Sequence, residues 1–224
     1  MNNKKVAAFF DFDLTITNYD SFRSYIFFLY LRHPQNYIYI PYIIYCMILK
    51  KLNFISLYEI KGLLLSAIKN KTIGEINKLS ERYLLSRNNC LFNDIALKKI
   101  LEHQNNGDLI FIISSSPDVI FEQVKNKIKP IEIISNELKF KDERFTGTLT
   151  GLDCYGENKK TIIKSLANKY NIDREKSFAY SDHYSDIPML SLVGNPSVVN
   201  PNSPLKLYAK KLDWPIEYWI NNAS

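Results

Sequence analysis

Cysteine is scarce in this sequence, with three residues, Cys46, Cys90 and Cys154, among 224. An odd number at irregular spacing excludes a readable disulfide framework, and no pair has the spacing of a zinc site. A reducing cytoplasm is therefore the expected compartment. Charged residues make up 23% of the chain and hydrophobic residues 46%, which excludes a disordered composition and is typical of a globular protein. The length suits one large domain, or a core domain with an insertion.

The sequence also lacks an apolar run long enough to span a bilayer. Residues 34–49 contain no charge, but Pro34 and Pro41 interrupt them, and a spanning helix needs about twenty predominantly apolar residues. This segment predicts a buried or interfacial helix instead. The apolar stretch at residues 6–10 ends at Asp11, so it does not predict a signal peptide. Internal repeats and low-complexity tracts are missing as well.

Positive charge is concentrated in one segment. The net charge is +6, and residues 20–90 contain ten Lys or Arg against four Asp or Glu, which leaves nineteen of each in the rest of the chain. The whole excess therefore lies in this segment and favours an anionic partner: a phosphorylated substrate, a lipid surface or nucleic acid. A solvated basic surface explains the same charge equally well.

From about residue 92 onward, short apolar runs alternate with amphipathic segments. This alternation predicts an α/β fold with a mainly parallel sheet covered on both faces. Residues 140–151, FKDERFTGTLTG, are typical of a β-hairpin instead. The expected strands span residues 6–10, 109–113, 131–135, 177–180 and 197–199.

Residues 19–90 break this alternation. They are rich in Tyr, Ile, Phe and Leu, contain glycine only at Gly62 and Gly74, and have the pattern of several helices. We expect a helical insertion after the first strand, which divides the chain into a core domain (1–18 and 91–224) and a cap domain (19–90). Ligands of parallel sheets bind beyond the carboxyl ends of the strands, so the residues that follow each strand carry the functional prediction.

Two carboxylates follow the first strand, Asp11 and Asp13. At this spacing on an extended chain the two side chains point the same way, and the pair is unfavourable unless a cation or a proton relieves it. Mg²⁺ prefers hard oxygen ligands and is the expected cation. Turn and cap chemistry is the structural alternative, because Asp is common there.

Three hydroxyls, Ser114, Ser115 and Ser116, follow the second strand. Ser116 and Pro117 together predict a helix start, with Ser116 as N-cap and Pro117 at the first helical position. Ser114 and Ser115 are left at the strand tip, where hydroxyl and backbone N–H groups can bind an anion.

Basic and acidic residues follow the later strands. Lys159 and Lys160 begin an apolar helix, where lysine opposes the macrodipole unless a phosphate is bound; one of the two fits a solvated helix start. Asp182 and Asp186 follow the strand at residues 177–180. Asp186 is also a potential N-cap of the next helix, whereas Asp182 has no such structural role. His183, between them, has the character of an exposed loop residue.

These residues resemble the motifs of the haloacid dehalogenase-like hydrolase superfamily. DFDLT (11–15) fits its D-x-D-x-T motif, Ser114 fits the second motif, Lys159 in GENKK the third, and SDHYSD (181–186) the acidic fourth. Flanking segments are similar to the phosphoserine-phosphatase-like subfamily, subfamily IB, whose helical cap lies between the first two motifs. The resemblance implies a Rossmann-like parallel sheet core with an inserted all-helical cap domain.

The resemblance also implies a phosphatase mechanism. Asp11 would be the nucleophile that forms an aspartyl-phosphate. Asp13 would be the general acid and then the general base, and its presence favours phosphatase or phosphomutase chemistry. Mg²⁺ would be bound by Asp11, the backbone carbonyl of Asp13 and Asp182, with Asp186 supporting the site.

The remaining motif residues would contact the substrate. Ser114, Ser115 and Lys159 would bind the phosphoryl oxygens. Asp20 and Arg23 lie at the entry to the cap, where relatives contact the leaving group; both are also explained as surface charges. Ser115 and Ser116 replace the Gly-Gly pair of phosphoserine phosphatases, and SDHYSD replaces G-D-G-x-N-D, so the phosphate pocket differs from theirs.

Three functions follow in order. The first is a Mg²⁺-dependent phosphatase of a small soluble phosphomonoester in the cytoplasm. The second keeps the chemistry but acts on a phosphorylated lipid headgroup, with the basic aromatic insertion in peripheral contact with the anionic inner face of a membrane. The third is a non-catalytic binding protein on the same fold. No nucleic-acid partner is expected, because no recognised module is present.

Overall fold

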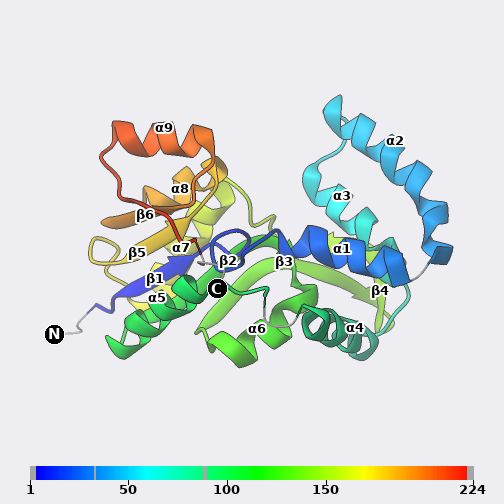
Figure 1. Cartoon of the computed structure of the whole chain (residues 1–224), viewed down its shortest axis with the longest axis horizontal. Helices are drawn as coiled ribbons and strands as arrows, with labels where there is room; N and C mark the ends of the chain where they lie inside the picture. Colours follow the sequence, from blue (N-terminus) through cyan, green and yellow to red (C-terminus); the bar gives the residue numbers. More distant parts are fainter. Residues whose placement is uncertain (1–3, 33, 88–89, 221–224) are drawn as a thin grey trace.

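The computed structural model describes residues 4–32, 34–87 and 90–220 (Figure 1). Within these ranges, seven strands form one sheet in the order β4-β3-β2-β1-β5-β6-β7. Neighbouring strands run parallel except β3 and β4, which are antiparallel. The mainly parallel sheet expected from the sequence is confirmed. Its strands are β1 (Ala7–Phe10), β2 (Leu109–Pro117), β3 (Glu132–Lys141), β4 (Arg144–Thr150), β5 (Phe178–Ser181), β6 (Asn195–Val199) and β7 (Ile216–Glu217).

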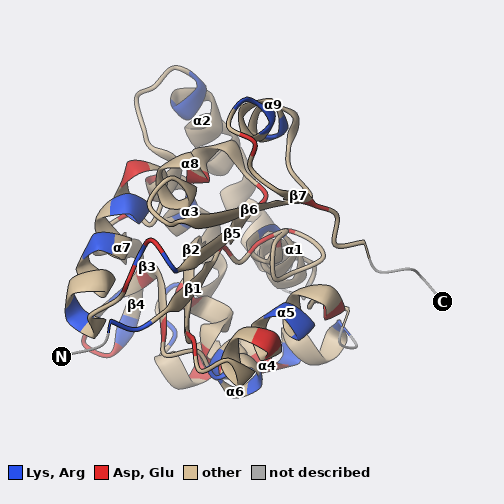
Figure 2. Cartoon of the chain, turned by 90° about the vertical axis from the view of Figure 1, so that its left-hand side faces the viewer, with Lys and Arg blue, Asp and Glu red and all other residues tan. Residues whose placement is uncertain are grey.

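Helices cover both faces of the sheet because side chains alternate along the central strands. In β1, Ala8 and Phe10 pack into one apolar cluster, whereas Ala7 and Phe9 pack into another on the opposite face. Figure 2 shows α7 and α5 on opposite sides of the strands. The first face is covered by α5 (Asp94–Asn105) and α6 (Phe121–Ile128), and the second by α7 (Glu157–Tyr170), α8 (Ile187–Leu190) and α9 (Ser203–Lys211).

The predicted hairpin is present, but its first strand is longer than expected. β3 pairs in parallel with β2 through Glu132 to Ile134, and further along it pairs with β4 in the antiparallel direction. The turn is made by Asp142 and Glu143, both with positive φ (48° and 60°). The expected strand at residues 131–135 and the first half of the hairpin are therefore one continuous strand, because β3 changes partner along its length.

The helical insertion, residues 19–90, leaves and rejoins the core at one place. Thr17 and Phe92 form an antiparallel bridge, and the N–H of Asn18 donates to the carbonyl of Leu91 at 2.9 Å. The expected helical character of the insertion is confirmed, and its division from the core into two domains stays a prediction. The insertion contains α1 (Ser21–Arg32), α2 (Ile40–Lys51), α3 (Leu57–Leu64), α4 (Ile73–Ser86) and two 3₁₀ turns, η1 (Pro34–Tyr39) and η2 (Leu65–Ile68).

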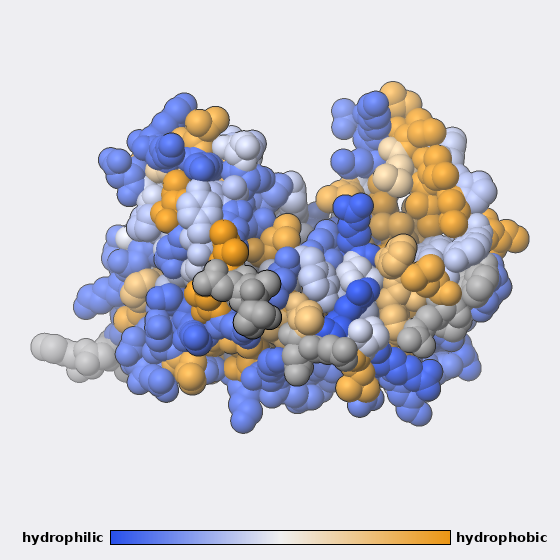
Figure 3. Space-filling view, in the orientation of Figure 1, coloured by the Kyte–Doolittle hydropathy of each residue, from blue (hydrophilic) through white to orange (hydrophobic). Residues whose placement is uncertain are grey.

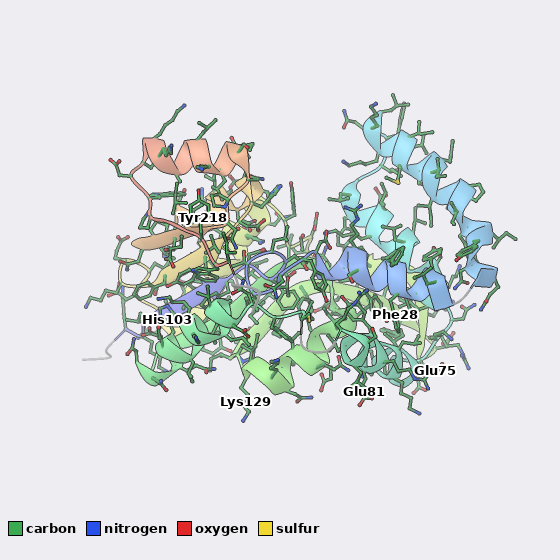
Figure 4. The ribbon with its side chains drawn as sticks, in the orientation of Figure 1. Phe28, Glu75, Glu81, His103, Lys129 and Tyr218 are labelled. Atoms are coloured by element: carbon green, nitrogen blue, oxygen red, sulfur yellow. The ribbon has the colours of Figure 1, made fainter. Side chains whose placement is uncertain are left out.

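The insertion and the sheet share one apolar cluster. Phe28 of α1, labelled in Figure 4, lies with its ring centroid 5.6 Å from that of Tyr83 in α4. The same cluster contains Phe10 of β1, as well as Phe12, whose ring packs edge-on against Phe121 at 4.9 Å. The position of the insertion over the sheet is therefore set by buried apolar contacts.

The uncharged segment at residues 34–49 forms η1 and most of α2. None of the helices in the described ranges combines the length and apolarity needed to span a bilayer. As expected, this segment does not form a spanning helix; most of its large apolar side chains are exposed, and Ile43 and Cys46 are the buried residues of α2.

Candidate active site

The three central strands bring distant segments together. β1 lies between β2 and β5 and runs parallel to both, so the carboxyl ends of all three meet at one edge of the sheet. Asp11 directly follows β1, and its N–H donates to the carbonyl of Tyr180 at 2.9 Å. Ser114 lies in the last part of β2, and Asp182 directly follows β5. Sheet topology alone thus places these three side chains at one edge.

Lys159 bridges two carboxylates. Its Nζ lies 2.6 Å from Oδ1 of Asp11 and 2.7 Å from Oδ2 of Asp186, and its side chain is 2% exposed. Burial alone would lower the pKa of Lys159, but the two carboxylates outweigh burial and raise it. Lys160, by contrast, has a 43% exposed side chain, 3.9 Å from Glu157. Of the two lysines that begin α7, Lys159 therefore lies in the site and Lys160 on the surface.

Asp186 is used differently from the structural alternative in the sequence. It occupies the N-cap position of α8, but its side chain makes no capping hydrogen bond. Instead, Oδ2 of Asp186 accepts from Lys159 and from the hydroxyl of Ser181 at 2.6 Å. His183 is exposed, and its Nδ1 accepts from the backbone N–H of Ser185 at 3.2 Å, so it caps the local turn.

Negative charge exceeds positive charge at this edge of the sheet. Burial raises the pKa of Asp182 to about 8, and the carboxylates of Asp11 and Asp186 add to the increase. Burial also raises the pKa of Asp11 to about 7; Asp186 adds to this increase, and Lys159 opposes it. Three carboxylates thus face one ammonium group, which is the condition that a divalent cation relieves.

The donor set fits Mg²⁺. Among the described residues, no three histidine, cysteine, aspartate or glutamate side chains lie close enough together to bind a metal ion by themselves. Mg²⁺ does not need three, since it is usually bound by one or two carboxylates together with water and substrate phosphate oxygens. The carboxylates of Asp11 and Asp182 supply this kind of site.

Asp13 points toward a different set of partners from Asp11. Its Oδ1 accepts from the N–H of Ser21, the first residue of α1, at 2.6 Å, and its Oδ2 accepts from the hydroxyl of Ser116. Burial raises the pKa of Asp13, and the nearby Asp20 carboxylate adds to this increase. Asp13 is therefore held by the insertion on one side and by β2 on the other.

The predicted helix start at Ser116 and Pro117 is wrong. β2 continues through Pro117, a 3₁₀ turn follows at Asp118–Ile120, and α6 begins at Phe121. The Ser116 hydroxyl therefore caps no helix and donates to Asp13 instead. The long-range hydrogen bond to Asp13 replaces the local capping bond, and a local pattern could not reveal it.

Ser114 and Ser115 have separate contacts. Ser114 is buried, and its hydroxyl accepts from the N–H of Ser116 at 3.1 Å. Ser115 accepts from Nζ of Lys61 through both its carbonyl (2.5 Å) and its hydroxyl (3.0 Å). Burial lowers the pKa of Lys61. Lys61 of α3 is a second ammonium group at the site that sequence reasoning missed, because nothing local separates it from the other basic residues of the insertion.

Asp20 and Arg23 lie at the start of α1. Both are exposed, and Oδ1 of Asp20 accepts from the N–H of Arg23 at 2.8 Å, which is a helix-capping contact. Asp20 therefore has a structural role, and a role for either residue in substrate binding stays a prediction.

All nine residues predicted for the site line one cavity of about 750 Å³, named here the strand-end pocket. Its walls also include Ser116 and three residues of the insertion, Met47, Leu57 and Lys61. The predicted residues in it are Asp11, Asp13, Asp20, Arg23, Ser114, Ser115, Lys159, Asp182 and Asp186. The convergence expected from the motifs is thus present in the structure.

Comparisons with known proteins agree with this geometry. Over 222 residues the chain is 26% identical to a phosphoserine phosphatase of Mycobacterium tuberculosis, covering 94% of this chain and 70% of that protein. A Bordetella pertussis protein of unknown function has the same fold, with a TM-score of 0.80 at 18% identity over 96% of this chain and 98% of that chain. A substrate-bound phosphoserine phosphatase has a TM-score of 0.68 at 20% identity over 97% and 95%.

The family follows from a match over most of the chain. The family model for haloacid dehalogenase-like hydrolases matches residues 8–191, a range that contains all four motifs and the insertion. The chain belongs to the haloacid dehalogenase-like hydrolase family.

Proposed function

We propose that the protein is a Mg²⁺-dependent phosphomonoesterase that acts through an aspartyl-phosphate on Asp11. Family membership supports a hydrolase, and the relatives that match include phosphatases. The observation that carries the proposal is the pairing of Asp11 with Lys159 at 2.6 Å in a pocket that also contains Asp13 and Asp182. A nucleophile, an acid and a phosphate-binding cation are the groups that phosphoryl transfer needs.

In this mechanism Asp11 attacks phosphorus. Lys159 binds Oδ1 of Asp11, so the other carboxylate oxygen is the candidate for attack. The bond from phosphorus to the leaving oxygen breaks as the bond to Asp11 forms. Asp13, whose raised pKa favours the protonated form, donates a proton to the leaving oxygen. Asp13 then takes a proton from water, which attacks the aspartyl-phosphate and releases phosphate.

Asp11, Asp182 and the backbone carbonyl of Asp13 would bind the Mg²⁺ ion, with Asp186 supporting the site. When bound, the ion neutralises carboxylate charge and polarises a phosphoryl oxygen. Ser114, Ser115 and Lys159 would bind the other phosphoryl oxygens as charge develops on them.

Phosphate release from an aryl phosphate tests the proposal. We expect Mg²⁺-dependent turnover that chelation and Asp11→Asn abolish. Asp142→Asn, in the exposed turn between β3 and β4, is the matched control and retains activity. Beryllium fluoride, a surrogate for the aspartyl-phosphate, should bind the unmodified protein and not Asp11→Asn. Turnover undiminished by Asp11→Asn would refute the proposal.

A phosphorylated lipid headgroup at an anionic membrane is the second candidate substrate. The observation that favours it is α2, in which Tyr42, Ile44, Tyr45, Met47 and Ile48 are each more than half exposed. Figure 3 shows apolar side chains gathered over this helix, and Figure 2 shows the basic end of α2, which holds Lys50 and Lys51. Apolar side chains beside basic ones suit an anionic bilayer surface.

Vesicle flotation tests the membrane candidate. We expect the protein to float with phosphatidylglycerol vesicles and not with phosphatidylcholine vesicles, and a Tyr45→Glu variant to remain in the dense fraction. Failure to bind anionic vesicles at low salt would leave the small soluble phosphomonoester, in the cytoplasm, as the proposed substrate.

A further inference from the structure

A second cavity, of about 940 Å³, lies beside the strand-end pocket and has mainly apolar walls. We name it the apolar groove. Its volume lies within the range of about 300–1,000 Å³ that is common for small-molecule sites. One wall is formed by Ile26, Phe27, Tyr30 and Leu31 of α1, and the other by Ile40 and Ile43 of α2.

The apolar groove opens into the strand-end pocket. Five residues line both cavities: Leu14, Asp20, Arg23, Ile26 and Leu64. Leu14 directly follows Asp13, the proposed acid for the leaving group, so the two cavities meet on the leaving-group side of the site. A chain attached to the leaving oxygen can therefore extend from the pocket into the groove.

Leu14 is held in an unusual backbone conformation at this junction. Its φ is 60°, in the left-handed region that favours glycine, and its side chain is partly exposed. A leucine is retained where glycine would avoid the conformational cost. It adds apolar surface where the two cavities meet.

We propose that the apolar groove binds an alkyl or acyl chain carried by the leaving alcohol, so that the substrate is an amphiphilic phosphomonoester. This inference rests on the proposed phosphatase function and adds the class of its substrate. Exposed apolar side chains elsewhere on α2 do not carry the argument, because the groove is distinguished by its opening into the strand-end pocket.

A series of soluble n-alkyl phosphates tests the groove. Each methylene moved from water into an apolar site favours binding by about fourfold. We therefore expect kcat/KM to rise on the order of a hundredfold from ethyl to hexyl phosphate, at concentrations below micelle formation. Equal kcat/KM along the series, with Asp11-dependent phosphate release, would overturn the groove proposal and leave the phosphatase function standing.

Two glutamine variants separate the groove from general surface effects. Phe27, in the groove wall, is 62% exposed, and Leu85 of α4, which lines neither cavity, is 70% exposed. Phe27→Gln should reduce the ratio of hexyl to ethyl kcat/KM at least tenfold, whereas Leu85→Gln should leave this ratio unchanged. Equal ratios in the two variants would contradict the assignment of the groove.

A vesicle arm identifies the source of the chain. Phosphate release from phosphatidic acid in phosphatidylcholine vesicles, together with a rising soluble series, assigns the chain to a membrane lipid; release from the soluble series alone assigns it to a soluble amphiphile. If no member of either series releases phosphate in an Asp11-dependent manner, both the proposed function and this inference are overturned. A flat series in which a second copy of the chain occupies the groove would appear as a dimer in sedimentation.

Discussion

At the scale of single residues, the site depends on pairs that are far apart in the chain. Asp13 and Ser116 are separated by 103 positions and share a hydrogen bond. Asp11 and Lys159 are separated by 148. Each pair joins a side chain at the end of β1 to one brought in by another element. The substitutions below separate the contribution of each pair from that of its neighbours.

Ser116→Ala should lower kcat/KM for an aryl phosphate roughly tenfold to a hundredfold, because a hydrogen bond to a charged group contributes about 1.5–3 kcal/mol. Ser116→Thr keeps the hydroxyl and should retain most of the activity. Steady-state kinetics of both variants provides the measurement. Full activity in Ser116→Ala would mean that the hydrogen bond to Asp13 has no part in the reaction.

Lys159→Ala should abolish turnover and lower the free energy of unfolding by about 3 kcal/mol, because it leaves Asp11 and Asp186 buried without their cation. Lys160→Ala, at the adjacent exposed position, should change stability by less than about 0.5 kcal/mol. Urea denaturation in the presence of a chelator measures both. Equal losses in the two variants would contradict the separation of the two lysines.

Asp118 provides a prediction for pH. Burial raises the pKa of Asp118 from 3.8 to about 6, and its Oδ1 accepts from the N–H of Leu138. The folded state thus holds the proton more tightly than the unfolded state, so this group's stabilisation is fully present below about pH 4 and is lost as the pH rises through about 6.

Asp118→Asn keeps the acceptor and removes the titration. The free energy of unfolding of the variant, relative to the unmodified protein, should therefore increase between about pH 4.5 and about pH 7.5 by on the order of 1–2 kcal/mol. Urea denaturation at the two pH values tests this, and a constant difference would show that Asp118 titrates normally.

At the scale of elements, α3 packs closely against β4. A Cβ added to Gly62 of α3 would lie 3.1 Å from the carbonyl oxygen of Gly147 and 3.2 Å from Cα of Thr148. Both neighbours are backbone atoms, which cannot rotate away. Gly62 therefore permits the close contact that places the adjacent Lys61 at the strand-end pocket.

Gly62→Ala should destabilise the protein by about 1–2 kcal/mol, although alanine is the better helix former by about 1 kcal/mol. Gly74→Ala is the matched control in α4, since a Cβ there meets no atom within 4 Å. It should be neutral or stabilising by up to about 1 kcal/mol. Urea denaturation of both variants is the measurement, and stabilisation of both would mean that α3 does not depend on this contact.

The element scale also shows where pattern reading succeeds. Helix α6 spans Phe121–Ile128, the range expected from the periodicity, because local apolar spacing determines which residues face the sheet. The expected helix start at Ser116 is wrong because β2 pairs with β3 as far as Pro117. Strand pairing is a long-range property, and here it overrides a local capping signal.

At the scale of the whole molecule, the insertion and the sheet are joined by a common apolar cluster. Tyr25 and Tyr83 of the insertion lie in the same cluster as Phe10 and Ile112 of the central strands. Opening one part therefore exposes apolar surface of the other, which couples the two parts energetically.

We expect a single cooperative unfolding transition. The two tryptophans, Trp214 and Trp219, lie outside the insertion and report on the core, whereas far-UV circular dichroism also reports the helices of the insertion. Urea curves from fluorescence and circular dichroism should coincide. Separate midpoints would show that the insertion unfolds as an independent unit.

The sequence by itself determined the class of fold and the main acidic site. Alternating apolar residues specify strands, and parallel strands present their carboxyl ends at one edge, so Asp11, Ser114 and Asp182 could be placed together without coordinates. The order of the four motifs supplied the family. These features are readable because each depends on local periodicity or on a short motif.

Only the tertiary structure decided which other side chains complete the site. Lys61, the Ser116–Asp13 hydrogen bond and the apolar groove all depend on how α1, α2 and α3 pack over the sheet. That packing arises from contacts between residues tens of positions apart, in which apolar side chains are largely interchangeable. Local spacing specifies that such helices form and which face they bury, but not where they come to rest on the sheet.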